Sequence, residues 1–432
     1  MKEIYERELL GKLEKWIDRR EILAVKGPRQ SGKTTLLKLL SEWLEKEKGV
    51  NPENIVFLTF EDREILEKFS LAPKDFVKSF VKKEGRRHYF LLDEIHYVKD
   101  GGQKLKLLYD TMENVKFIAT GSSSLEIILL SKYLVGRVFS FHLFPFSFHE
   151  FLLARDQRIA GIYREKNEAV RNFILGNGEL QTAEDIFLPD VRKFFEEYLV
   201  FGGYPDVVKA ENAEEKRMVL KNIYETYIGR EIVELLRILD IFKFRKLVTV
   251  LSSQLGGLIN YSSLSEACGS YYKEIVGLLN VLEETYVVKL VRPFHRNIRT
   301  ELRKNPKVYF IDPGLRNYGI NNFNPIGIRG DSGALVENHA FLALSDIVGD
   351  FWKVNYWRTL GKAEVDFILI LGEEVVPVEV KYAGFKRPEV SRGFRSFLAA
   401  YRPKRGVVLT KDFWGEAEIS GAEIKFVPAC YA

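Results

Sequence analysis

A glycine-containing segment near the N-terminus has the residue types and the spacing of a phosphate-binding loop. Residues 24–40 read AVKGPRQSGKTTLLKLL, in which Gly27 and Gly32 frame four residues and Lys33 and Thr34 follow. An apolar run precedes the loop and a helical pattern follows it, which is the context that makes this motif specific. Backbone N–H groups of such a loop, and the positive end of the following helix, bind phosphates.

The loop predicts a site for ATP and Mg²⁺. Lys33 would contact the β- and γ-phosphates, and Thr34 would bind the metal ion. The alternative, a chance glycine-containing turn, fits this context less well. The residues expected around the nucleotide are Gly27, Pro28, Arg29, Gln30, Ser31, Gly32, Lys33, Thr34 and Thr35.

Three further segments supply polar residues that such a site needs. The run HYFLLDE ends in Asp93, expected in the Mg²⁺ shell, and Glu94, expected to orient and deprotonate the attacking water. After VKFIAT, Ser122 is the candidate sensor of the γ-phosphate, although a turn of small residues needs no such role. Arg137 would stabilise transferred charge in cis or from a neighbouring subunit, or is an ordinary surface arginine.

A second group of charged residues lies in the C-terminal stretch EVDFILILGEEVVPVEVK, residues 364–381. Two apolar runs predict a β-hairpin that turns at Gly372 and the residue after it. In that register Asp366 lies opposite Glu379, and Lys381 shares the face of Glu379 because strand side chains alternate. A one-residue bulge would instead move Asp366 to the other face. The hairpin therefore predicts a patch of two carboxylates and one lysine.

Glu337 is a candidate third carboxylate of this patch. It falls on an apolar helical stripe that includes Phe341 and Leu344, so it is either buried with a partner or wrongly placed. Carboxylates suit Mg²⁺, which prefers oxygen ligands and leaves positions for water and phosphate. The alternative is a plain Glu379–Lys381 ion pair in a fold without catalysis.

The elements that must position these groups follow from hydrophobic periodicity. Five strands are expected at 22–26, 55–60, 89–92, 115–120 and 138–142, alternating with helices as in an α/β layered domain. From Phe148 to about Arg230 the pattern is helical, with a loop expected at 172–186. Helices at 241–258 and 271–284, separated by a short connection and followed by a strand pair, have the order of a winged helix.

The strand pair encloses a basic segment. Between Tyr286 and Phe310 there are seven Lys or Arg residues, Lys307 among them, and a single acid, Glu301. Such a bias suits contact with a phosphate backbone, although runs of charge are usually solvated loops. The candidate DNA-binding residues are Arg292, Arg296, Arg299, Arg303 and Lys304.

Composition sets wide limits on the protein. The chain has 432 residues, 46% of them hydrophobic and 29% charged, a net charge of +5 and two cysteines. These values indicate a soluble protein of two to four domains with no disulfide framework. Neither a spanning segment nor a signal-peptide core is apparent, so a cytoplasmic location without membrane contact is expected. Abundant Lys and Glu with few Met favour a thermophilic source.

Several motifs together resemble one family. The order GPRQSGKTTLL, FLLDE, TGSSS, GR, LFPFSFHEF and YLVFGGYPDVV resembles archaeal and bacterial ATPases of the AAA+ group. The resemblance covers essentially the whole chain. It implies an ATPase core followed by a winged helix and a restriction-endonuclease-like domain, a homo-oligomer such as a hexameric ring, and branched DNA as a substrate.

The resemblance also gives roles to the hairpin residues. Asp-x12-Glu-x-Lys after a glutamate-bearing helix resembles the PD-(D/E)XK nuclease core. Asp366 and Glu379 would then bind Mg²⁺ or Mn²⁺, and Glu337 would complete the metal shell. Lys381 would position the water or offset charge in the transition state.

The predicted fold class is therefore α/β multidomain: a P-loop NTPase core at 1–145, a helical lid at 146–232, a winged helix-turn-helix at 233–305 and an endonuclease-like domain at 306–432. The predicted function is ATP hydrolysis coupled to metal-dependent action on double-stranded or branched DNA. The alternative is a nucleotide-dependent signalling switch or scaffold whose nuclease fold is inactive.

Overall fold

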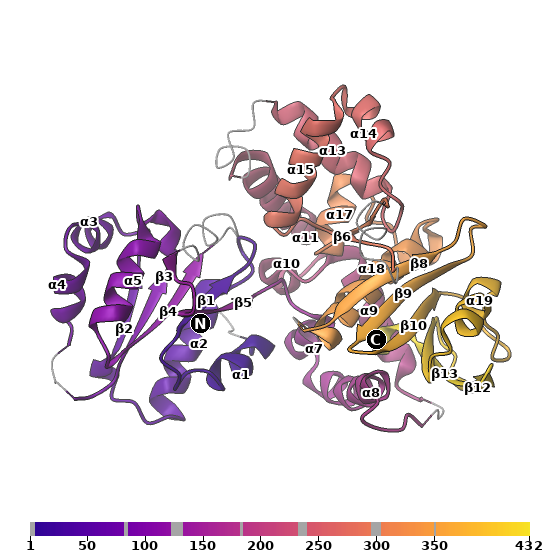
Figure 1. Cartoon of the computed structure of the whole chain (residues 1–432), viewed down its shortest axis with the longest axis horizontal. Helices are drawn as coiled ribbons and strands as arrows, with labels where there is room; N and C mark the ends of the chain where they lie inside the picture. Colours follow the sequence, from indigo (N-terminus) through magenta and orange to yellow (C-terminus); the bar gives the residue numbers. More distant parts are fainter. Residues whose placement is uncertain are drawn as a thin grey trace. The chain divides into compact units, whose positions relative to one another are not determined.

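A computed structural model describes residues 5–81, 85–121, 133–181, 185–231, 240–294, 304–349 and 351–432. The chain forms two compact units (Figure 1). The first comprises Met1–Phe146 with Glu284–Tyr286, and the second comprises Ser147–Glu283 and Val287–Ala432. How the second unit divides into lid, winged helix and nuclease-like domain stays a prediction.

The first unit is built on a five-stranded parallel sheet. Its strand order is β2-β3-β4-β1-β5. The strands are β1 (Ile22–Lys26), β2 (Ile55–Thr59), β3 (His88–Asp93), β4 (Val115–Gly121) and β5 (Val138–His142). Each matches its predicted range to within one residue at either end. Near-continuous apolar runs made the strands recognisable, because a parallel sheet of this kind is buried on both faces.

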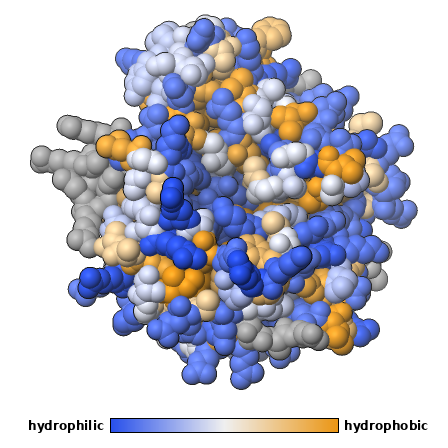
Figure 2. Space-filling view, turned by 90° about the vertical axis from the view of Figure 1, so that its right-hand side faces the viewer, coloured by the Kyte–Doolittle hydropathy of each residue, from blue (hydrophilic) through white to orange (hydrophobic). Residues whose placement is uncertain are grey.

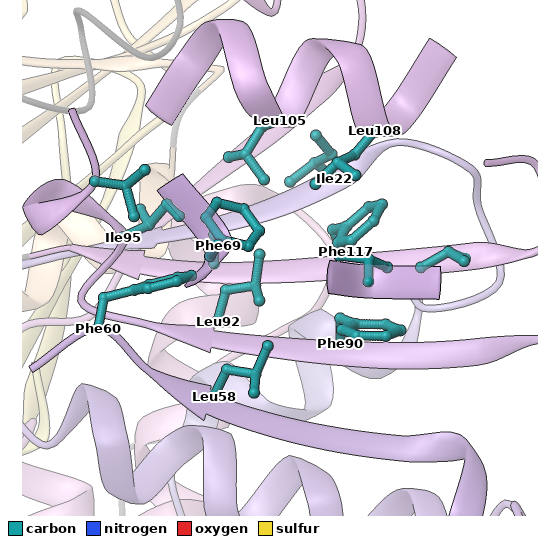
Figure 3. Close-up of a cluster of buried hydrophobic side chains, with 14 of the residues drawn as sticks. Ile22, Leu58, Phe60, Phe69, Phe90, Leu92, Ile95, Leu105, Leu108 and Phe117 are labelled. Atoms are coloured by element: carbon teal, nitrogen blue, oxygen red, sulfur yellow. The ribbon is translucent and has the colours of Figure 1, made fainter. Parts of the chain in front are cut away.

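Helices cover both faces of this sheet. One face carries a cluster of Phe, Leu, Ile and Val side chains that includes Phe69, Phe90 and Leu105 (Figure 3). The other face packs against Leu13, Leu36 and neighbouring leucines. The helical elements are α1 (Glu8–Glu14), α2 (Lys33–Lys46), η1 (Pro52–Asn54), α3 (Arg63–Leu71), α4 (Pro73–Lys78), η2 (Ile95–Tyr97) and α5 (Gly101–Thr111).

The second unit starts with a run of helices, as predicted. These are α7 (Phe148–Arg155), α8 (Gln157–Leu175), α9 (Leu188–Phe201), α10 (Pro205–Lys209), α11 (Ala213–Ile223) and η3 (Tyr224–Glu231). A capping box between Ser147 and Glu150 fixes the start of α7. The loop predicted from residue 172 is wrong at its first four residues, because α8 continues until Gly176, whose φ of 75° ends the helix.

Three helices and a two-stranded antiparallel sheet follow. They are α13 (Ile241–Ser253), α14 (Tyr261–Cys268), α15 (Tyr272–Glu284), β6 (Val288–Val291) and β7 (Lys307–Phe310). The expected helix to residue 258 ends early at Ser253, and Gly256 beyond it has a φ of 69°. The expected short connection is itself α14, which is capped by the Asn260 side chain.

The C-terminal part contains a six-stranded mixed sheet in the order β12-β13-β11-β10-β9-β8. Its strands are β8 (Lys353–Arg358), β9 (Glu364–Leu371), β10 (Glu374–Lys381), β11 (Arg405–Thr410), β12 (Gly415–Ile419) and β13 (Ala422–Pro428). Its helical elements are α17 (Pro313–Gly319), η4 (Ile326–Ile328), α18 (Ser332–Val348), α19 (Arg392–Tyr401) and η5 (Ala429–Tyr431). Both strands of the predicted hairpin, β9 and β10, are confirmed.

The face of the molecule in Figure 2 is largely hydrophilic, with small scattered hydrophobic patches. Single exposed apolar residues of this kind are normal on soluble proteins. Within the described parts of the chain, no helix combines the length and the apolar character that crossing a bilayer requires.

A buried aspartate joins two distant segments of the second unit. Asp312 accepts hydrogen bonds from the backbone N–H groups of Gly203 and Leu315, each at 2.8 Å. A Cβ atom at Gly202 would lie 2.3 Å from the Asp312 carboxylate, and one at Gly314 would lie 2.0 Å from the carbonyl oxygen of Phe201. Both glycines are therefore required by close packing between the FGGYPD segment and α17.

This aspartate gives a testable pH dependence. Burial raises the pKa of Asp312 to about 6, although hydrogen bonds from backbone N–H groups act to lower it. From about pH 4 to pH 6 the folded state keeps a proton that the unfolded state has lost. We expect the free energy of unfolding to fall by roughly 3 kcal/mol over that range because of this group.

The measurement is urea unfolding at several pH values. In Asp312→Asn, which has no titrating group at this position, that decrease should be absent. Asp346→Asn, a change at an exposed aspartate of α18, should keep the wild-type dependence. An identical pH dependence in wild type and Asp312→Asn would contradict this account.

Candidate functional site

The predicted phosphate loop connects β1 to α2. A Cβ atom at Gly27 would lie 2.0 Å from the carbonyl oxygen of Leu143, so only glycine fits there. Gly32 has a φ of 95° and directly precedes the helix, and Gln30 has a φ of 58°. The loop therefore passes through left-handed conformations that bring its backbone around toward the start of α2.

The Lys33 ammonium is held within this loop. Lys33 is 4% exposed, and its Nζ donates to the carbonyl oxygens of Gly27 at 3.2 Å and Pro28 at 3.0 Å. The Ser31 hydroxyl also donates to the Pro28 carbonyl, at 2.8 Å. A buried cation at a helix N-terminus fits the phosphates of a nucleotide, which are strong partners for an ammonium.

Asp93 lies at the end of β3 and is held on both carboxylate oxygens. Thr34 Oγ1 donates to Asp93 Oδ2 at 2.8 Å, and Thr120 Oγ1 donates to Asp93 Oδ1 at 2.6 Å. Thr120 Oγ1 in turn accepts from the backbone N–H of Glu94 at 3.0 Å. A hydroxyl and a carboxylate in contact at the start of α2 are a suitable pair of oxygen ligands for Mg²⁺.

Sequence reasoning missed Thr120. It selected Ser122, which lies outside the described residues. The pairing of β3 with β4 points to Thr120. Leu92 pairs with Ala119, and the residues that follow them are Asp93 in β3 and Thr120 in β4. Two polar residues that end adjacent parallel strands must lie close together.

Glu94 adopts a left-handed conformation, with a φ of 53°, directly after Asp93. Its Oε2 lies 2.9 Å from Nδ1 of His96. Burial acts to raise the pKa of Glu94, but the interaction with His96 and the charge of Lys33 outweigh it and the pKa is lowered. A carboxylate of lowered pKa is a weaker base, so this electrostatic environment suits orienting a water better than removing its proton.

Arg137 does not fit a catalytic role in cis. It precedes β5 at the edge of the sheet where β1 begins, and its backbone carbonyl accepts from the N–H of Ile22. The phosphate loop follows the other end of β1, five residues or roughly 16 Å away. The Arg137 guanidinium instead pairs with Asp110, at 2.8 Å. Action across a subunit interface stays a prediction.

The hairpin brings the C-terminal charged residues together as expected. Leu371 pairs with Glu374 and Phe367 with Val378, so the same register places Asp366 beside Glu379. Lys381 Nζ lies 3.3 Å from Glu379 Oε1. This unbroken register excludes the alternative in which a one-residue bulge moves Asp366 to the other face of the hairpin.

Glu337 also reaches this cluster, but it has other partners. Its Oε1 accepts from Lys307 Nζ at 3.1 Å and from the Tyr309 hydroxyl at 2.6 Å. Lys307 Nζ lies 2.7 Å from Glu364 Oε1 as well. The expectation that an acid on the apolar stripe has a partner is confirmed, since Glu337 is partly buried and pairs with a lysine of β7.

The electrostatics of the cluster follow from its burial. Burial and the charge of Glu337 raise the pKa of Asp366 to about 7, against the opposing effect of Lys307. Burial acts to lower the pKa of Lys307, but the charges of Glu337, Asp366 and Glu364 outweigh it and raise the pKa. Lys307 therefore stays protonated at neutral pH.

A metal set of three carboxylates is not assembled. Among the residues that the structure describes, no three His, Cys, Asp or Glu side chains are arranged to hold a metal ion. Glu337 is directed to Lys307 and Tyr309, so the ligand set predicted from the sequence reduces to Asp366 and Glu379. Two carboxylates still fit Mg²⁺, which proteins commonly bind through one or two carboxylates together with water and substrate phosphate.

The basic segment is described in part. Arg292 and Lys304 are partly exposed, whereas Arg296, Arg299 and Arg303 lie outside the described residues. Lys307, the last of the seven cations counted in this segment, is 4% exposed and faces carboxylates, so it is not placed to contact DNA phosphates.

Comparisons with known proteins give the class of the first unit. Residues 19–152 match the AAA domain family. Residues 192–325 and 332–423 match two domains of unknown function, DUF8612 and DUF4143. The chain thus carries an AAA-type ATPase-like domain, which implies nucleotide binding and the use of Mg²⁺.

Two uncharacterized proteins match the chain over about three quarters of their own length. The chain is 24% identical over 400 residues to the uncharacterized protein Rv2008c of Mycobacterium tuberculosis, covering 91% of this chain and 77% of that protein. It is 23% identical over 369 residues to the uncharacterized protein MJ1544 of Methanocaldococcus jannaschii, covering 84% and 75%.

Two solved structures have partial similarity to the chain. PCH-2 of C. elegans matches with a TM-score of 0.30 and 14% identity, over 52% of this chain and 64%, less than two thirds, of that one. A signal transduction ATPase with numerous domains from Pyrococcus horikoshii matches with a TM-score of 0.28 and 12% identity, over 80% of this chain and 46% of that one.

The first prediction for this site concerns Lys33. Lys33→Ala should lower ATP turnover by about a hundredfold or more, because the variant lacks the cation that faces the transferred phosphate. Lys38→Ala, an exposed position on the same helix, should retain wild-type turnover. Phosphate release at saturating ATP measures both. Unchanged hydrolysis in Lys33→Ala would contradict the nucleotide assignment.

The second prediction concerns His96 as a positioning residue for Glu94. His96→Ala should lower kcat for ATP hydrolysis by about tenfold while the KM for ATP changes little, because the nucleotide contacts remain. His96→Asn, which keeps a nitrogen donor near the Nδ1 position, should recover part of the loss. A purely structural role predicts no such recovery and a parallel loss of thermal stability.

Proposed function

We propose that the protein is an ATP-hydrolysing AAA-type protein that acts on DNA, and that its C-terminal charged cluster is a metal-dependent nuclease-like site. The observation that carries the ATPase part is the Asp93 carboxylate, which contacts Thr34 at 2.8 Å and Thr120 at 2.6 Å beside the phosphate loop. Mg²⁺ bound there would offset phosphate charge and orient the nucleotide.

Four residues would have separate roles in ATP hydrolysis. Lys33 binds the β- and γ-phosphates, Thr34 and Asp93 hold the ion, and Glu94 orients the water. The Thr120 hydroxyl donates to Asp93 and accepts from the backbone N–H of Glu94. The same side chain would therefore position both the metal-binding Asp93 and the water-orienting Glu94.

The DNA part of the proposal rests on order and charge. The helices α13, α14 and α15 followed by the antiparallel pair β6 and β7 have the order of a winged helix. The sequence between those strands contains Arg292 and Lys304 with further arginines, and so supplies charge suited to a phosphate backbone.

The nuclease-like part rests on the hairpin register. Asp366 and Glu379 lie beside each other on adjacent strands, and Lys381, half exposed at the edge of the same face, pairs with Glu379. Asp366 and Glu379 would bind Mg²⁺ or Mn²⁺, and Lys381 would position a water or offset negative charge on a phosphodiester. A homo-oligomer, such as a hexameric ring, and a cytoplasmic location belong to this proposal.

One observation favours the alternative, a nucleotide-dependent switch or scaffold with an inactive nuclease fold. Glu337 is engaged by Lys307 and Tyr309, so the third carboxylate of the expected metal shell is committed elsewhere. In that case ATP binding would control assembly or protein contacts, and the cluster would be a buried network of ion pairs.

A cleavage and binding assay separates the two functions. Linear, single-stranded and four-way branched DNA would be incubated with Mg²⁺ or Mn²⁺, with and without ATP. We expect metal-dependent cleavage in wild type and none in Asp366→Asn or Lys381→Ala, because those variants lack a ligand or the adjacent cation. Asp412→Asn, at a half-exposed aspartate paired with Arg192, is the matched control and should cut normally.

Two other outcomes would change the assignment. If wild type shifts DNA in a gel but does not cut it, the protein is a DNA-bound ATPase. Neither cutting nor binding would favour the switch.

A further inference from the structure

Lys307 is a buried cation whose nearest partners are carboxylates from two different elements. It opens β7 and is 4% exposed. Its Nζ lies 3.1 Å from Glu337 Oε1 of α18 and 2.7 Å from Glu364 Oε1 of β9. A single ammonium therefore bridges a helix and a strand that both border the proposed metal site.

The local charge needs this ammonium. Glu337, Glu364 and Asp366 converge on Lys307, and the charge of each acts on it. Carboxylates held this close repel one another strongly when no cation lies among them. A buried ion pair from which one partner is removed leaves an uncompensated charge, which is costly.

Lys307 and the proposed divalent ion use different oxygens. Glu337 Oε1 accepts from both Lys307 and the Tyr309 hydroxyl, so its position is fixed toward β7. Asp366 accepts from the backbone N–H of Val380 through Oδ2, and among the described residues no hydrogen bond occupies Oδ1, which leaves that oxygen for an ion. Glu379 lies beside Asp366 in the hairpin register. Its Oε1 is 3.3 Å from Lys381 Nζ, and its Oε2 accepts from the backbone N–H of Ser391 at 3.4 Å. One side of the cluster thus holds a fixed cation, and on the other side an exchangeable ion would bind Asp366 Oδ1 and take Glu379 Oε1 in place of its contact with Lys381.

We propose that the Lys307 ammonium is the resident cation of this carboxylate cluster, and that it restricts the site to one divalent ion held by Asp366 and Glu379. The proposal rests on the metal-binding function proposed above. In two-metal sites the second ion lies about 3.5–4 Å from the first and shares carboxylates with it. Here a lysine supplies that second positive charge.

The test is the binding of Mn²⁺ to the full-length, nucleotide-free protein, measured by titration calorimetry. Wild type should bind one Mn²⁺ per chain. Lys307→Met should bind a second ion, or the same ion about tenfold more tightly, because a repelling charge is gone. Asp366→Asn gives the background from other sites. Lys425→Met is the matched control, since Lys425 is also buried and paired with two glutamates, Glu416 and Glu423.

The outcomes separate this proposal from the one on which it rests. One ion of equal affinity in wild type and Lys307→Met would overturn the resident cation and leave the metal site intact. Two ions in wild type would overturn it as well. No bound Mn²⁺ in wild type and in Lys307→Met would overturn both proposals.

A second measurement covers the case in which Lys307→Met is too unstable to titrate. Urea unfolding without metal would compare Lys307→Met, Glu337→Gln and the double variant. We expect the single lysine change to be more destabilising than the double change, since the latter removes both charges of one pair. If Lys307→Met fails to fold and the double variant folds, the proposal is supported. An equal loss of unfolding free energy in Lys307→Met and in the double variant would overturn the proposal.

Discussion

The Asp93 carboxylate is the contact on which the nucleotide site depends. It accepts from Thr34 at the start of α2 and from Thr120 at the end of β4, and Thr120 also holds the backbone of Glu94. One buried acid thereby joins the phosphate loop, the proposed metal-binding position and Glu94, the residue proposed to orient water. Because Asp93 and Thr120 end adjacent parallel strands, the sheet itself fixes this geometry, and the flanking helices need only keep the sheet packed.

The second unit uses one buried and one partly buried acid in the same structural way. Asp312 ties the Gly202–Gly203 turn to α17, and Glu337 ties α18 to β7 through Lys307. Each carboxylate receives backbone or side-chain donors, as burial of charge requires. Asp366 likewise accepts from the backbone N–H of Val380, but burial and the charge of Glu337 raise its pKa to about 7 against the opposing effect of Lys307.

Much of this arrangement follows from local sequence. The five parallel strands were recognisable as apolar runs, and the turn at Gly372 fixed the register that places Asp366 beside Glu379. Contacts between distant segments were not predictable in the same way. Lys307 looked like one more cation of a basic loop, since only the fold brings it to Glu337. Arg137 had a plausible spacing, but strand direction puts it at the opposite edge of the sheet from the phosphate loop.

The most direct test of the central contact is ATP binding with and without Mg²⁺, measured by calorimetry for wild type and Asp93→Asn. The account predicts that wild type binds ATP more tightly when Mg²⁺ is present. Asp93→Asn should retain Mg²⁺-free binding through Lys33 and the loop but lose most of the gain from the metal. An equal gain from Mg²⁺ in both proteins would contradict the assignment of Asp93, and with it the site built around that carboxylate.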